Sequence, residues 1–238
     1  MHLHHLGDIT TDAQTALITG DPDRVPLLAE DLGTVKTTWT KRGYVCAEVW
    51  TADEPILVCS TGIGGPTTAI VVEELAQLGV SRLIRVGTCG SMQAKVRAGH
   101  IVISSGAVRD EGTSHQYLPP EYPAVPSFAL LRAVADAAEA EGAPHHVGIT
   151  HCKDAYYAEK PDGFPRADDW RKRWAELRSA GVLATEMEAA VLFAVAAVRG
   201  PLAAALFVAV DSTLSPDETL ASLRTAARVA ARGAAATR

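Results

Sequence analysis

The sequence predicts an α/β fold built around a largely buried β-sheet. Apolar runs of strand length alternate with longer segments of helical periodicity along the 238 residues. No linker-like stretch interrupts this alternation, and the hydrophobic fraction of 47% is sufficient for a large core. We therefore expect one domain spanning residues 1–238, in which helices flank the sheet.

The first half of the chain contains two cycles of strand and helix. Strands are predicted at residues 16–19, 44–50, 55–59 and 82–86, and helices at residues 22–32 and 67–78. Pro22 suits the first turn of a helix, where a missing N–H leaves no helical hydrogen bond unmade. Gly20 ends the first strand and Gly79 ends the second helix. Residues 61–66 form a glycine-rich loop between a strand and a helix.

The second half continues the alternation around one long loop. Strands are predicted at residues 101–104, 145–150 and 202–210, and helices at residues 128–141, 167–179, 186–198 and 217–232. Residues 109–126 contain four prolines and are predicted to be irregular. Loops of this length within a compact domain often carry function.

Composition and charge exclude several functional classes. The net charge of −6 argues against a nucleic-acid partner, which usually requires a basic stripe. No apolar run is long enough to span a membrane, and residues 1–8 lack the features of a signal peptide. The four cysteines are scattered without a C-x-x-C pair, which favours reduced thiols over disulfides or a zinc site. We expect a cytoplasmic protein with no metal centre.

Three segments place glycine or polar residues where a buried strand ends, which is where α/β folds usually bind ligands. Gly20 and Arg24 begin a predicted helix and suit a phosphate group, although an ordinary strand-to-helix turn, which is the commoner case, also explains them. Arg85 lies within an apolar strand and requires an anionic partner, either a ligand or a structural carboxylate. Glu186 and Glu188 begin a helix, where they can cap it or accept sugar hydroxyls.

The order and combination of these segments resemble the nucleoside phosphorylases of the uridine phosphorylase and hexameric purine nucleoside phosphorylase type. The resemblance implies a single domain with a central mixed, partly barrel-like sheet flanked by helices. It extends from about His5 to the last predicted helix. The matching stretches are His5-Leu6-Gly7, Gly20-Asp21-Pro22-Asp23-Arg24, residues 60–79, Arg85-Val86-Gly87-Thr88, Asp154-Ala155-Tyr156-Tyr157 and Glu186-Met187-Glu188-Ala189-Ala190.

The resemblance also implies roles for individual residues. Phosphate, as the second substrate, is expected to bind Gly20, Arg24, Arg85, Thr88 and an Arg42 supplied by a neighbouring subunit. Ribose is expected to contact Glu186, Met187, Glu188 and a neighbour's His5. Such sharing implies a homo-hexamer assembled as a trimer of dimers. No cofactor is expected.

Base recognition departs from the uridine phosphorylase pattern, because residues 157–163 lack the glutamine and arginine that read uracil in that branch. The base is expected to contact Cys89, Gly90, Tyr156 and Glu159, although Lys160 competes with Glu159 for the alignment. The Thr88-Cys89-Gly90 stretch is closer to the purine branch.

The resemblance to the purine branch implies a catalytic pair. Asp211 is expected to be buried, to hold a proton through a raised pKa and to donate it to purine N7, assisted by Arg224. Phosphorolysis of purine nucleosides to free base and (deoxy)ribose 1-phosphate is therefore the expected activity. A uridine phosphorylase with an altered base pocket is the alternative, followed by a water-using nucleosidase and a non-catalytic nucleoside-binding protein.

Overall fold

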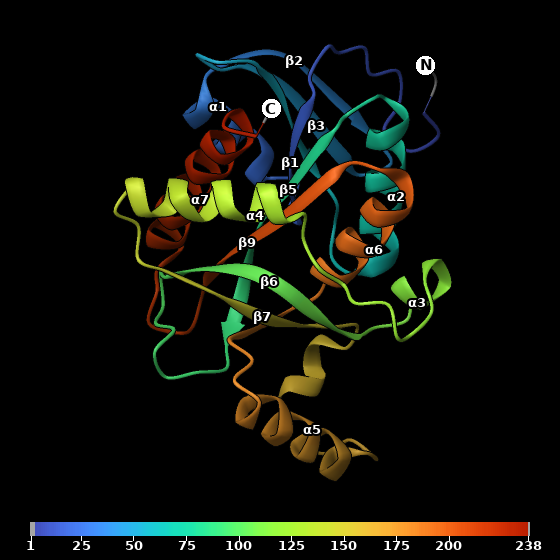
Figure 1. Cartoon of the computed structure of the whole chain (residues 1–238), viewed down its shortest axis with the longest axis vertical. Coiled ribbons are helices and arrows are strands. Elements are labelled where there is room, and N and C mark those ends of the chain that lie inside the picture. The colour runs from blue at the N-terminus through green and yellow to red at the C-terminus, as the bar shows by residue number, and fades with distance from the viewer. Residues whose placement is uncertain (1–2, 238) are drawn as a thin grey trace.

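The computed structural model describes residues 3–237 and places a mixed β-sheet at the centre of that part of the chain (Figure 1). The strands are β1 (Thr15–Thr19), β2 (Thr34–Lys41), β3 (Tyr44–Trp50), β4 (Pro55–Ser60), β5 (Arg82–Ser91), β6 (Ile101–Asp110), β7 (His145–Lys153), β8 (Ala184–Glu186) and β9 (Leu202–Ala209). The α-helices are α1 (Arg24–Leu32), α2 (Gly65–Gln77), α3 (Ser114–Tyr117), α4 (Phe128–Ala140), α5 (Ala167–Ser179), α6 (Ala189–Arg199) and α7 (Pro216–Ala235), and a 3₁₀ turn η1 covers Tyr156–Glu159.

The sheet closes on itself along part of its width. Its strand order is β2-β3-β4-β1-β5-β8-β7-β6-β9, and β9 also pairs with β5 in parallel. Strand β5 therefore has neighbours on both sides within a ring formed by β5, β8, β7, β6 and β9. The prediction of a mixed, partly barrel-like sheet in an α/β fold is confirmed.

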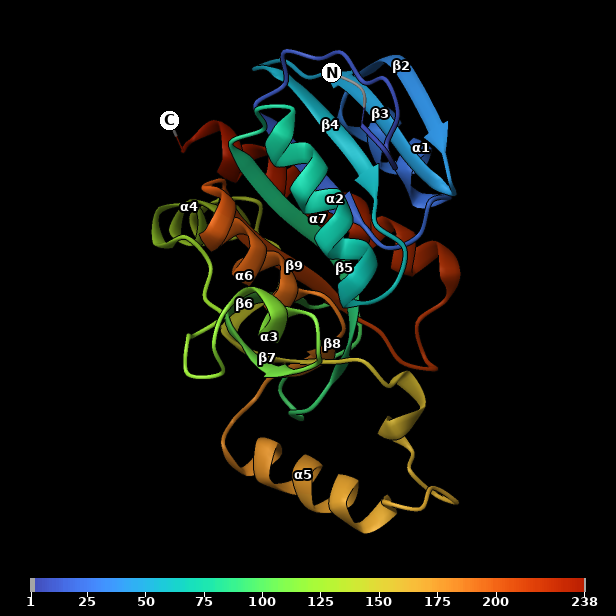
Figure 2. The same ribbon diagram turned by 90° about the vertical axis from the view of Figure 1, so that its right-hand side faces the viewer.

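Helices cover the two faces of the sheet. Helices α2 and α6 pack together on one side, whereas α4 and α7 cover the other side with α1 beside them (Figures 1 and 2). Alternation along β1 separates the two cores, because Ile18 packs into the α2 and α6 side and Leu17 into the α1 and α7 side. Helix α5 extends from the end of the molecule opposite β2 and β3 (Figure 2).

Several elements differ from the sequence prediction. Strand β2 was not predicted, because it lies at the edge of the sheet and most of its residues are exposed, so it has no apolar run. Strand β8 is only three residues long, which is too short for a periodicity signal, and α6 consequently begins at Ala189 instead of residue 186. Strand β5 continues beyond Val86 to Ser91, so it is longer than the predicted strand at residues 82–86.

The proline-rich segment at residues 109–126 is only partly irregular. Strand β6 continues to Asp110, and the short helix α3 follows. The guanidinium of Arg109 then donates to the backbone carbonyls of Leu118, Pro119 and Tyr122 at 2.6–2.8 Å. These hydrogen bonds satisfy backbone carbonyl groups that lie outside helices and strands, and they thereby hold the segment in place.

Within residues 3–237, no helix combines the length and the apolar character needed to cross a membrane.

Helices α4 and α7 cross at a glycine. A Cβ added to Gly233 would lie 2.7 Å from Val134 Cγ2 and 2.8 Å from Val134 Cα. We predict that Gly233→Ala lowers the free energy of unfolding by about 1–3 kcal/mol, although alanine is the better helix former. Chemical denaturation measures this change. An unchanged or higher stability would contradict the close approach of the two helices.

Candidate functional site

A cavity of about 660 Å³ opens where several strands end. Its walls come from the β1–α1 turn, the loop before α2, the last residues of β5, the end of β7, η1 and the β8–α6 junction. The structure therefore brings together eleven of the predicted site residues, namely Gly20, Arg24, Arg85, Thr88, Cys89, Gly90, Tyr156, Glu159, Glu186, Met187 and Glu188. Their roles toward ligands stay predictions.

One end of the cavity is cationic. Arg24 and Arg85 both line it, together with Gly20 and Thr88. Burial, and secondarily the positive charge of Arg85, lowers the pKa of Arg24, while nearby Asp21 opposes the shift. Gly20 allows the close approach, because a Cβ at this position would lie 3.3 Å from Arg85 Nη2. Two neighbouring guanidinium groups and a hydroxyl form a suitable site for a phosphate-sized anion.

A buried ion pair connects this end to the middle of the cavity. Arg85 Nη2 donates to Glu188 Oε2 at 2.7 Å, and both side chains are about 95% buried. The second carboxylate oxygen of Glu188 accepts the backbone N–H of Gly64, also at 2.7 Å. Arg85 Nη1 donates to Thr61 Oγ1, whereas its Nε has no partner among the described residues. The predicted anionic partner of Arg85 is thus another predicted site residue.

Glu186 lies beside this ion pair, where a negative charge is unfavourable because the side chain is buried and close to Glu188. Burial, and then the charge of Glu188, raises the pKa of Glu186 to about 7. Its Oε2 accepts the backbone N–H groups of Glu188 and Ala189, which start α6. The other oxygen, Oε1, is buried and has no hydrogen-bond partner in the described structure. Glu186 therefore serves as a helix cap and also offers an unused acceptor to a ligand hydroxyl.

The far end of the cavity combines an aromatic ring with charged groups. Tyr156 is exposed at the mouth, and Glu159 lines the wall, whereas Lys160 does not. Burial raises the pKa of the Cys89 thiol, so Cys89 stays protonated and packs as a small side chain. The sequence prediction missed Lys153, which lies at the end of β7 and lines the same wall. Only its position before Asp154-Ala155-Tyr156 in the sequence pointed to it.

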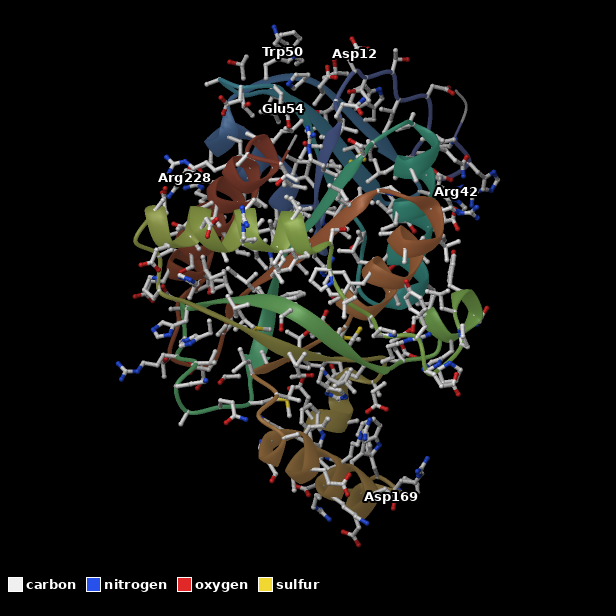
Figure 3. The ribbon with its side chains drawn as sticks, viewed as in Figure 1. Asp12, Arg42, Trp50, Glu54, Asp169 and Arg228 are labelled. Atoms are coloured by element: carbon white, nitrogen blue, oxygen red, sulfur yellow. The ribbon has the colours of Figure 1, made fainter. Side chains whose placement is uncertain are left out.

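Four predicted site residues do not line the cavity, and two of them, His5 and Arg42, were expected to serve a neighbouring subunit. His5 Nδ1 contacts Glu74 Oε1 at 2.9 Å, and the backbone N–H groups of His5 and Leu6 donate to the same carboxylate. Arg42 occupies the turn between β2 and β3 and lies at the right-hand edge of the molecule in Figure 3. Neither residue reaches the cavity of its own chain, so their assignment to a neighbour's site stays a prediction.

The expected catalytic pair does not assemble. Asp211 is exposed and does not line the cavity, although the adjacent Val210 does. The Thr213 hydroxyl and N–H bind the Asp211 carboxylate and lower its pKa, so the prediction of a buried, protonated Asp211 is wrong. Arg224 is also placed differently, because its guanidinium faces Asp31 of α1 at 3.9 Å. Arg228, one turn further along α7, binds the same carboxylate at 2.8 Å (Figure 3).

The chain has relatives among known proteins over most of its length. The family model of the phosphorylase superfamily matches residues 14–237. Uridine phosphorylase of Treponema pallidum is 40% identical over 82% of this chain and 77% of its own length. Guanosine phosphorylase of Halorubrum lacusprofundi is 39% identical over 84% of this chain and 79% of its own, and uridine phosphorylase of Escherichia coli is 36% identical over 82% and 80%.

The raised pKa of Glu186 has a consequence for stability. A carboxyl whose pKa rises on folding destabilises the native state as the pH increases from the unfolded value of 4.5 to about 7. We predict that Glu186→Gln, which removes the charge and preserves the shape of the side chain, abolishes this loss of stability at higher pH. Relative to the wild type, the variant should gain on the order of 3 kcal/mol between pH 4 and pH 8.

Denaturant unfolding at the two pH values measures this difference. Glu139→Gln, at an exposed position of α4, is the matched control and should show the same pH dependence as the wild type. A Glu186→Gln variant that tracks the wild type at both pH values would contradict a charged, desolvated Glu186.

Proposed function

This chain belongs to the phosphorylase superfamily, and we propose that it is a nucleoside phosphorylase in which the cavity binds phosphate and a nucleoside side by side. The observation that carries the proposal is the arrangement of charge within one cavity. Arg24, Arg85 and Thr88 form a cationic end, and Glu186 and Glu188 lie directly beside it. This order matches a reaction in which an anion attacks a sugar.

The cationic end would hold and orient phosphate. Guanidinium groups bind phosphate oxygens through paired, charge-assisted hydrogen bonds, and Arg85 Nε, which has no partner in the described part of the chain, can contribute one. A phosphate held in this way is close to the ribose carbon that it attacks, which lowers the entropic part of the barrier. Phosphate is the second substrate in this proposal, and the reaction uses no cofactor.

The two glutamates would bind the sugar. Within residues 3–237, Glu186 Oε1 is a buried acceptor without a partner, and Glu188 accepts only from Arg85 and the Gly64 N–H. Vicinal ribose hydroxyls are suitable donors for such carboxylates. During the reaction a phosphate oxygen forms a bond to the anomeric carbon, and the glycosidic electron pair leaves with the base. The products are the free base and a pentose 1-phosphate.

Two bases are candidates. The names of curated relatives from Treponema pallidum and Escherichia coli favour uridine, in agreement with a uridine phosphorylase whose base pocket is altered. The relative from Halorubrum lacusprofundi is named for guanosine. Both bases present a ring N–H beside a ring carbonyl, and the Lys153 and Glu159 charges on the cavity wall suit such an edge. The N7 acid role of Asp211 is not part of the proposal, because Asp211 lies outside the cavity.

We propose further that a neighbouring subunit completes the site. The exposed Arg42 and the partly exposed His5 are placed on the surface of the chain, where they can reach an adjacent copy. A hexamer built as a trimer of dimers would give each cavity these two residues. The support for this assembly is the family resemblance of the two positions, together with their distance from the cavity of their own chain.

The activity is tested by incubating the enzyme with uridine, guanosine, inosine and adenosine, each with and without inorganic phosphate. We expect base release that requires phosphate and yields a pentose 1-phosphate. Base release that ignores phosphate would indicate a water-using nucleosidase. Tight nucleoside binding without turnover would indicate a binding protein.

We predict that Arg24→Gln raises the KM for phosphate by about 10–100-fold, the loss expected for one charged hydrogen-bonding group. Arg24 is a suitable target because its contact with Asp21 is 3.8 Å long and partly exposed. The substitution therefore breaks no buried ion pair. Arg132→Gln, at an exposed position of α4, removes the same charge far from the cavity and should leave the KM unchanged. Equal values for both variants would contradict the phosphate site.

A further inference from the structure

Lys153 is an unusual side chain for the wall of a cavity. It is 1% exposed, although lysine is rarely buried unless it is paired. It lies at the last position of β7 and lines the cavity near the exposed ring of Tyr156, 6.0 Å from its Nζ. A buried ammonium group at this position indicates a role other than packing, because an aliphatic side chain would fill the same space without the cost of desolvating a charge.

Two oxygen atoms hold the ammonium group in place. Lys153 Nζ lies 2.7 Å from Glu159 Oε1 and donates to Thr185 Oγ1 at 3.0 Å. An ammonium group has three hydrogens, so these two contacts leave one hydrogen without an oxygen partner among the described residues. Because Lys153 lines the cavity, a ligand there can accept this remaining hydrogen.

A chain of polar contacts behind Lys153 limits its movement. Thr185 Oγ1 also lies 3.3 Å from Nδ1 of His151, whose side chain is fully buried. The other nitrogen, Nε2, lies 2.9 Å from Asp110 Oδ2, and Arg173 binds the same carboxylate oxygen at 3.2 Å. Thr185 and His151 are paired positions of β8 and β7, so the sheet itself sets the position of the lysine.

Glu159 completes an ordered set of groups along the wall. Its Oε1 contacts Lys153, and its Oε2 faces Gly90, where an added Cβ would be 3.7 Å away. The side chain is one-third exposed, and it comes from η1, next to Tyr156. From Lys153 to Gly90 the wall therefore presents one donor followed by two acceptors.

We propose that Lys153 and Glu159 read the edge of the base and select guanine, an inference that rests on the proposed nucleoside phosphorylase function. Guanine presents its O6 acceptor, its N1–H donor and its 2-amino donor in sequence. This order is complementary to Lys153 Nζ, Glu159 Oε1 and Glu159 Oε2. Tyr156 at the mouth can stack on the face of the purine ring.

Other bases fit the same three groups less well. Uracil presents acceptor, donor and acceptor, which places a carbonyl oxygen against the second carboxylate oxygen of Glu159. Hypoxanthine lacks the 2-amino group and leaves that oxygen without a partner. Adenine places an amino group against Lys153 and a ring nitrogen lone pair against the carboxylate. A site that is built to pair an N–H discriminates strongly against a base that lacks it.

Lys153 also contributes to the chemical step in this arrangement. When the glycosidic bond breaks, the electron pair enters the purine ring and raises the negative charge on O6. A buried ammonium group at O6 stabilises that charge where water is largely excluded. The proton needed by the departing base can be taken up from water after the bond has broken, so no additional acid is required.

The first test uses the unmodified enzyme at saturating phosphate. We expect the kcat/KM for guanosine to exceed that for inosine and for uridine by at least about 10-fold. Equal or higher values for uridine would overturn the selection of guanine. If no nucleoside is cleaved in a phosphate-dependent manner, the proposed function itself fails, which is a separate result.

Variants then assign the selectivity to the two residues. Glu159→Gln should reduce the ratio of kcat/KM for guanosine to kcat/KM for inosine to nearly 1, because the amide presents a donor to the 2-amino group. Lys153→Met should lower kcat by about 100-fold for guanosine, with a smaller change in KM, because the charge acts mainly as the bond breaks. Lys160→Met, in the exposed end of the same segment, is the matched control and should leave both parameters unchanged.

Folding defects do not obscure the result. Glu159 is the more exposed residue of the Lys153–Glu159 ion pair, so Glu159→Gln remains informative if Lys153→Met is unstable. A guanosine-to-inosine ratio that is the same in Glu159→Gln and the wild type would overturn the proposal. The substrate ratios of the wild type require no variant at all.

Discussion

The ion pair between Arg85 and Glu188 is the interaction on which the site depends. It joins the middle of β5 to the start of α6 across 103 residues of sequence, and both charges are removed from water. Removing one partner would leave the other buried and unpaired, which costs about 3–5 kcal/mol in comparable cases. The glycine-rich loop before α2 belongs to the same unit, because the N–H of Gly64 donates to Glu188.

The closed part of the sheet explains why these groups meet. Because β5 pairs with β8 on one side and with β9 on the other, the residues after Val86 stay in extended conformation and lead Thr88 and Cys89 along the cavity wall. The short strand β8 pairs Thr185 with Gly90 of β5, and Glu186, the next residue, lines the same cavity. An open sheet would leave the chain after Val86 without a partner on one side and therefore less well positioned.

The sequence was informative about these residues for a physical reason. A buried arginine and paired glutamates are unfavourable unless they have partners, and a glycine weakens a strand, so these residues stand out from an apolar background. The positions of Asp211 and Arg224 were predicted wrongly because they depend on the path of the chain after β9. No local sequence pattern determines that path. Lys153 was missed because a lone lysine after an apolar strand normally turns to solvent, and only the surrounding Thr185 and Glu159 reveal that it is buried.

The same ion pair determines how two ligands would share the cavity. In the proposed function, phosphate at Arg85 would compete with Glu188 for the guanidinium, and ribose at Glu188 would compete with Arg85 for the carboxylate. Either ligand alone would weaken the ion pair and leave one buried charge with fewer partners, whereas both together would supply new partners to each side. The two proposed ligands would therefore favour each other's binding, because the second one would compensate the charge that the first one exposes. In this way, the Arg85–Glu188 ion pair would link the binding of the two proposed substrates.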